Sequence, residues 1–123
     1  MLSYVKETSK VNYDYKTKDI FVKTRPLKDV FKEENMTLID YMSIDVEGHE
    51  IQVLKGIDFN EVKINVLTIE NNFGGSSGDS QYGDDEIRRI MFENGYILWG
   101  RIVNLDDIYV RNDFIKSLEV DKA

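Results

Sequence analysis

The sequence of 123 residues contains no cysteine and only one histidine, His49. Without cysteine, the chain cannot form a disulfide, a thiolate zinc site or a cysteine nucleophile. A zinc centre of the usual nitrogen and sulfur type is therefore not expected either. Glycine is also scarce at the start, because the first eighteen residues contain none. A glycine-rich ligand loop is thus excluded from that segment.

A net positive charge and long apolar runs are lacking as well. The net charge is −7, which argues against electrostatic binding to nucleic acid or to an anionic membrane. No run approaches transmembrane length, and the first ten residues lack the apolar core of a signal peptide. Since 41% of the residues are hydrophobic and 32% are charged, we expect a globular cytoplasmic protein.

Apolar strands and helices alternate along the chain, which predicts an α/β fold. Both faces of the strand at 38–46 are apolar, as is typical of an interior parallel strand covered by helices on both sides. A short polar turn links the last two strands and requires an antiparallel hairpin. The predicted strands are 19–23, 38–46, 63–70, 96–103 and 107–111. The polar segments 1–18 and 112–123 flank this domain of residues 19–111.

Proline and glycine place the ends of the predicted helices. Pro26 opens the first helix, with Thr24 or Arg25 near its cap. Gly48 ends the strand before the second helix, which Gly56 terminates. The third helix begins after Asp84 or Asp85 and stops at Asn94-Gly95, and Tyr96, Ile97 and Trp99 follow as core and sheet-face residues. A loop rich in glycine and serine at 73–83 is interpreted as a solvated linker or a cover over the substrate.

Acidic residues gather where the strand at 38–46 ends. Ligands of open α/β sheets bind beyond the carboxyl ends of the strands. Asp45 could take a proton from a substrate hydroxyl, or bind a divalent cation together with Glu47. The alternative is that these acids cap the next helix, and this interpretation is favoured for Glu50. His49 is interpreted as a surface or capping residue.

The next strand, at 63–70, ends in a second polar group. Glu70, Asn71 and Asn72 should line the same cleft, because the carboxyl ends of parallel strands meet at one edge of the sheet. Hydrogen bonding to a substrate is one interpretation of these three residues, and an ordinary polar loop start is the other.

Four stretches of the sequence resemble the FkbM-type methyltransferase domain. They are DYMSIDVEGHEIQVLKGIDF at 40–59, INVLTIENN at 64–72, the GY pair at 95–96 and DDIYVR at 106–111. The family's I-D-V-E-G-x-E sequence stands intact at 44–50, and its V-L-K-G follows at 53–56. The resemblance implies a truncated class I, Rossmann-like three-layer sandwich whose parallel strands are closed by a C-terminal antiparallel hairpin. It also implies O-methylation of a sugar or small-metabolite hydroxyl, with S-adenosylmethionine as the methyl donor.

The glycine-rich first half of that family domain has no counterpart in this sequence. The family begins with a strand and a turn of the form D-x-G-A-N-x-G, where the backbone approaches the cofactor. No cofactor-binding residue is therefore identified here, and the chain is expected to be incomplete on its own. Two alternatives follow: a non-catalytic remnant or interaction module, and a cation-binding module built on Asp45, Glu47 and Glu70.

The missing strands would also leave the strand at 40–46 as an open edge. An apolar open edge invites pairing with another strand. Residues 1–23, a second copy or a partner chain should therefore cover it, and we expect self-association. The remaining expected partner is the small-molecule substrate.

Overall fold

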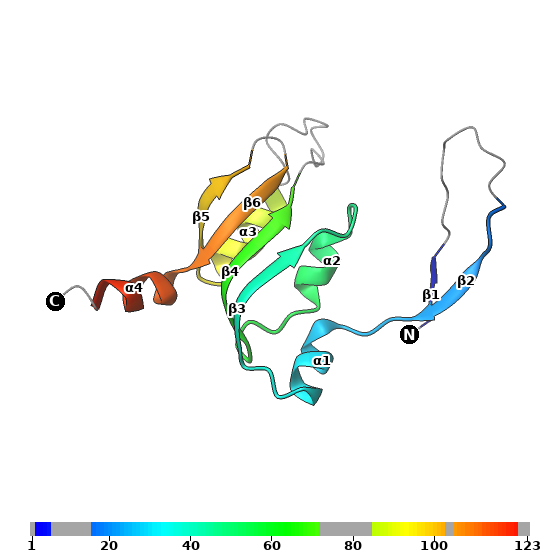
Figure 1. The fold of residues 1–123 in the computed structure, drawn as a ribbon, viewed down its shortest axis with the longest axis horizontal. Helices are drawn as coiled ribbons and strands as arrows, with labels where there is room; N and C mark the ends of the chain where they lie inside the picture. Colours follow the sequence, from blue (N-terminus) through cyan, green and yellow to red (C-terminus); the bar gives the residue numbers. More distant parts are fainter. Residues whose placement is uncertain (1, 6–15, 72–84, 103–104, 121–123) are drawn as a thin grey trace.

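A computed structural model describes residues 2–5, 16–71, 85–102 and 105–120, and a mixed four-stranded sheet is its central element (Figure 1). β3 and β4 run parallel, whereas β6 is antiparallel to both β4 and β5. The predicted α/β class is confirmed, with a single parallel pair in the sheet. Across the sheet the strands are β3 (Leu38–Ile44), β4 (Lys63–Glu70), β6 (Asp106–Arg111) and β5 (Tyr96–Arg101).

β4 forms the centre of the core. It is rich in β-branched residues, which favour a strand, and Ile64, Leu67 and Ile69 are completely buried. Hydrogen-bonded neighbours on both sides satisfy its backbone. Each such side chain stabilises the fold by about 1.5–3 kcal/mol through burial. The carboxyl end of β4 is therefore a fixed point, from which Glu70 and Asn71 extend.

Two helices cover one face of the sheet, α2 (Glu50–Lys55) and α3 (Asp85–Glu93) (Figure 1). Leu54 from α2 and Ile87 and Met91 from α3 join the buried cluster. The apolar spacing predicts this inward face of α3, and the helix ends before Asn94-Gly95 as expected.

The other face of the sheet has no helical cover among the described residues. Strand register aligns Tyr41, Val66, Val110 and Ile97 in one row across it. Tyr41 is 56% exposed, and Trp99 is 68% exposed on β5. The predicted three-layer sandwich is thus wrong for this part of the chain, which has two layers. The reason is that α2 and α3 both pack on the same face.

β3 lies at the edge of the sheet and not in its interior. Among the described residues it pairs only with β4, and Leu38 and Tyr41 on it are exposed. Apolar residues on both faces suit an interior strand but do not supply its neighbours, so among the described residues β3 is the open edge that the missing strands were expected to leave.

The described N-terminal strands do not pair with that edge. β1 (Leu2–Val5) pairs with β2 (Ile20–Lys23) in a separate antiparallel two-stranded sheet. The strand predicted at 19–23 therefore exists, but it lies outside the main sheet (Figure 1). The predicted glycine and serine loop at 73–83 falls outside the described residues.

Two further helices flank the sheet. α1 (Leu27–Glu33) begins after Pro26, which is itself the N-cap, and the Lys28 amide donates to the Gly56 carbonyl at 2.8 Å. α4 (Asn112–Val120) occupies the predicted polar tail. No helix in the described part of the chain is long and apolar enough to cross a membrane.

Candidate functional site

A tight turn carries the acidic motif from β3 into α2. Glu47 and Gly48 take left-handed backbone conformations, with φ of 52° and 100°. This conformation costs a non-glycine residue roughly 1–2 kcal/mol. One carboxylate oxygen of Glu50, Oε1, accepts hydrogen bonds from the amides of Val46 (3.1 Å) and Gly48 (3.3 Å). Glu50 therefore holds the turn that presents Asp45.

Three carboxylates meet at the carboxyl ends of β3 and β4. One oxygen each of Asp45, Glu50 and Glu70 lies within 4.8 Å of the other two. Glu50 is 3% exposed and Glu70 is 8% exposed, whereas Asp45 is open to solvent. The site thus has two buried acids behind one accessible acid. We call these three residues the acidic cluster.

The structure groups these acids differently from the sequence pattern. Asp45 and Glu70 come together, as expected from the shared edge of parallel strands. Glu47 is exposed and is not one of the clustered acids. Glu50, assigned to the helix end from sequence, holds the turn and also belongs to the cluster. The reversal of the chain at Gly48 was the available signal, because it brings residues 45 and 50 to the same place.

His49 has no part in this cluster. It stands at the N-cap position of α2, but its side chain makes no capping hydrogen bond and is exposed. The interpretation as a surface residue is consistent with this placement, whereas the capping interpretation is not.

A second buried carboxylate, Asp107 on β6, lies beside the cluster. It is paired in register with Ile69 and is completely buried. Its carboxylate accepts four hydrogen bonds. The donors are Asn71 Nδ2 (2.8 Å), Tyr109 Oη (2.8 Å), Arg101 Nη1 (2.7 Å) and Arg88 Nε (3.3 Å). We call these five residues the Asp107 network.

The Asp107 network shifts the proton affinities of its members. Burial by itself raises the pKa of Asp107, but the hydrogen bonds from Asn71, Tyr109 and the two arginines outweigh burial and lower it. Burial and the adjacent Asp107 charge raise the pKa of Tyr109 above its usual value. Asp107 is thus ionised, and its partners are all donors.

Asn71 belongs to this network. It is almost fully buried. Its backbone amide donates to Leu105 O (2.8 Å), and its carbonyl accepts from Arg101 Nη2 (2.6 Å). Asn71 therefore fixes the end of β4 next to Glu70. Asn72, the other predicted substrate residue of this loop, lies outside the described residues.

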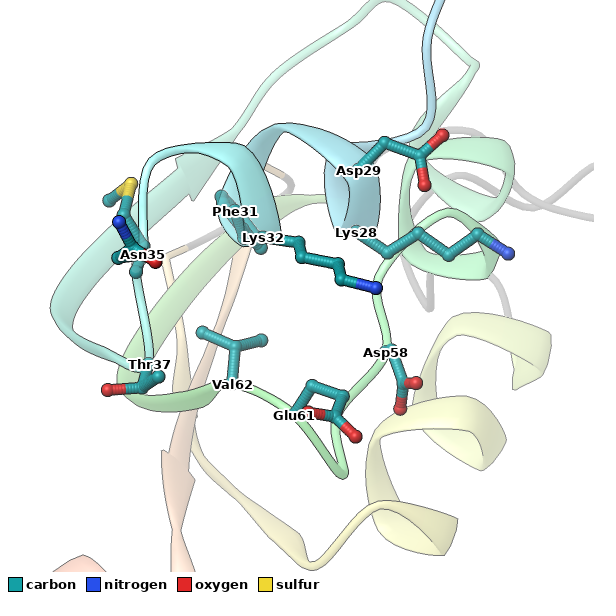
Figure 2. Close-up of a pocket in the computed structure, with 10 residues that line it drawn as sticks. Lys28, Asp29, Phe31, Lys32, Asn35, Thr37, Asp58, Glu61 and Val62 are labelled. Carbon is teal, nitrogen blue, oxygen red and sulfur yellow. The ribbon is translucent and has the colours of Figure 1, made fainter.

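A hollow among the described residues lies at the opposite end of β3 and β4. It holds about 440 Å³ between α1 and the segments that lead into these strands. Figure 2 shows the Lys32 side chain extending from α1 over this hollow, with Asp58 and Glu61 on the opposite wall. None of the acidic cluster lines it.

Comparison with known proteins identifies one family. A model of the FkbM methyltransferase domain matches residues 4–98, which include the acidic cluster and most of the sheet. No curated protein and no solved structure matches the chain.

Proposed function

The chain belongs to the FkbM methyltransferase domain family, and on that premise we propose that it forms the substrate-facing part of an S-adenosylmethionine-dependent O-methyltransferase. The acceptor in this proposal is a hydroxyl of a sugar or a small metabolite. One observation carries the proposal: the family's acidic turn stands at the carboxyl edge of the sheet, with an exposed carboxylate in front of two buried ones. Ligands of open α/β sheets bind at this edge.

Asp45 is the proposed general base. Its carboxylate is exposed at the end of β3, so a substrate hydroxyl can reach it and give up its proton as the methyl group is transferred. The turn held by Glu50 keeps Asp45 in place, and positioning of this kind supplies much of the rate of a displacement reaction. Glu70 is the proposed hydrogen-bonding partner of the same substrate, along with Asn72, whereas the substrate role predicted for Asn71 is replaced in this proposal by positioning, since its amide and carbonyl are engaged in the Asp107 network.

The residues present do not by themselves fit the methyl donor. No glycine precedes Gly48 in the sequence, and the close approach of backbone to a cofactor needs residues without side chains. When bound, S-adenosylmethionine supplies an activated methyl group. In this proposal the residues that bind the methyl donor are not among these 123. The Rossmann-like architecture and the cytoplasmic location are proposed for the completed enzyme.

Two features of the fold support completion by further residues. β3 has one hydrogen-bonded neighbour, and the sheet face bearing Tyr41 and Trp99 is exposed and aromatic. Both surfaces are of the kind that a complete sheet covers. The same absence of an early glycine favours a second candidate, a non-catalytic interaction module that keeps the fold.

Calorimetric titration of S-adenosylmethionine distinguishes these functions. We expect no binding by the chain alone. We expect binding and methyl transfer when a polypeptide with the D-x-G-A-N-x-G strand and the strands after it is added. Asp45→Asn should then lower the transfer rate about 10²–10⁴-fold without changing the affinity for the donor, and Glu47→Gln serves as the control. A complex that assembles but neither binds the donor nor transfers a methyl group would favour the interaction module.

A further inference from the structure

We propose that Asp45, Glu50 and Glu70 bind a hard divalent cation, and that Ca²⁺ fits the site best. The cation site consists of the acidic cluster alone. It does not depend on methyl transfer, because it uses only side chains that the fold already brings together.

The first argument is the environment of Glu70. Its side chain is 8% exposed, and it points into the acidic cluster, where its carboxylate faces Asp45 and Glu50. Within the described ranges, no hydrogen bond or ion pair reaches this carboxylate. A buried charge without a partner is costly. A bound cation would supply the missing partner.

The second argument is the absence of basic side chains at the cluster. In the described part of the chain, no lysine or arginine forms an ion pair with any of the three acids. The nearby Arg88 and Arg101 are directed instead at Asp107. Among the described residues, the three carboxylates therefore face one another without a paired positive charge, and carboxylate oxygens are the ligands that Ca²⁺, Mg²⁺ and Mn²⁺ prefer.

The number of carboxylates favours the larger ion. Ca²⁺–oxygen distances are about 2.3–2.6 Å, so oxygens on opposite sides of the ion lie about 4.6–5.2 Å apart. The corresponding span for Mg²⁺, at about 2.0–2.1 Å per bond, is roughly 4.0–4.2 Å. The three cluster oxygens lie within 4.8 Å of one another, a limit compatible with the Ca²⁺ span. Ca²⁺ also accepts several carboxylates in a flexible geometry, whereas Mg²⁺ is usually held by one or two carboxylates and keeps several waters.

The two ends of the site are also suited to a cation. Oε1 of Glu50 accepts hydrogen bonds from two backbone amides, which orients this carboxylate. Such outer contacts are typical of metal-binding carboxylates. Asp45 is exposed, so water or a substrate oxygen can complete the coordination from that side.

The test is the unfolding temperature of the full chain, freed of metal by chelation and then titrated with Ca²⁺, Mg²⁺ or Mn²⁺. We expect Ca²⁺ to raise this temperature most, since a ligand that binds the folded state stabilises it. Calorimetry should show Ca²⁺ binding that Glu70→Gln weakens by about tenfold or more. Without metal, Glu70→Gln should unfold at the same or a higher temperature than the wild type, a result that a merely structural role for Glu70 would not give.

The matched control is Glu47→Gln, which removes one negative charge from the same turn outside the cluster. This variant should bind Ca²⁺ like the wild type. If Glu70→Gln fails to fold, the exposed Asp45→Asn replaces it and should weaken binding similarly. The proposal is overturned if no cation changes the unfolding temperature of the wild type, or if the cluster variants and the control respond alike. A response to Mg²⁺ equal to that for Ca²⁺ would overturn the choice of ion. No methyl donor is present, so either failure leaves the methyltransferase proposal untouched.

Discussion

Two acidic sites lie at one end of the sheet, and they are built in opposite ways. Asp107 is surrounded by donors, including two arginines. The acidic cluster of Asp45, Glu50 and Glu70 contains no basic residue. The two lie in neighbouring strands, because Asp107 is paired with Ile69, the residue before Glu70.

This difference indicates the role of each group. A buried charge whose hydrogen bonds are all satisfied strengthens and specifies the fold around it. Carboxylates that face one another without counter-charges weaken the fold, so their presence indicates a ligand or a reaction. The Asp107 network holds Asn71 and the end of β4 in place, and the acidic cluster uses that fixed end to present Glu70.

The largest expected effect comes from removing Asp107. Asp107→Leu leaves Arg88 and Arg101 partly buried without their shared anion. Breaking a buried ion pair from one side costs about 3–5 kcal/mol of folding free energy. Denaturant unfolding measures this loss, and the adjacent Asp106→Asn is the control, expected to change stability by less than about 0.5 kcal/mol. Equal stability of the two variants would remove the distinction between the network and the cluster.

Acid should weaken the fold through the same residue. The pKa of Asp107 is lower in the folded chain than its usual value. Its contribution to stability is therefore fully present above pH about 4, the unfolded value, and is lost as the pH falls below that. We expect the free energy of unfolding to fall as the pH drops below about 4, and Asp107→Asn to flatten this fall. If the variant loses the same free energy of unfolding at low pH as the wild type, the loss belongs to other carboxylates.

The acidic turn could be predicted from sequence because its signals are local. The strand before Asp45, the break at Gly48 and the helix up to Gly56 are all read from neighbouring residues. The strand Lys63–Glu70 has the predicted bounds for the same reason. Both strands are parallel, so their acidic ends had to share one edge.

The Asp107 network could not be predicted in this way. Its hydrogen bonds join residues 36, 19, 6 and 2 positions apart. Only the antiparallel placement of β6 beside β4 brings these donors to one carboxylate. The exposed face of the sheet was missed for a related reason. Apolar residues such as Tyr41 and Trp99 suit a covered face, but their pattern does not say which segment covers it.

Removing Glu70 should have the opposite sign from removing Asp107. In the metal-free chain, Glu70→Gln relieves repulsion between carboxylates whose oxygens lie within 4.8 Å. A pair of like charges at such a distance costs about 1 kcal/mol in water-like surroundings. We expect the free energy of unfolding to rise by about 1 kcal/mol, measured with denaturant and with a chelator present. A loss of stability comparable to that of the Asp107 variant would mean that both groups are structural.

The two groups also differ in their position across the sheet. The variant with the smallest expected effect on stability, Leu38→Lys, tests this difference. Asp107 lies on an interior strand, whereas Asp45 follows β3, whose outer edge is unpaired among the described residues. We predict that the isolated chain self-associates by pairing β3 with β3 of a second copy about a two-fold axis.

Leu38→Lys places a charge on this edge at a side chain that is 58% exposed. Its free energy of unfolding should change by less than about 0.5 kcal/mol, yet a charge on an edge strand should prevent pairing. Sedimentation at micromolar concentration should therefore show an oligomer for the wild type and a monomer for the variant. A wild-type monomer would contradict the pairing. An oligomer that persists in Leu38→Lys would show that the copies make contact elsewhere than at β3. The edge of β3, next to the acidic cluster, would then remain unpaired.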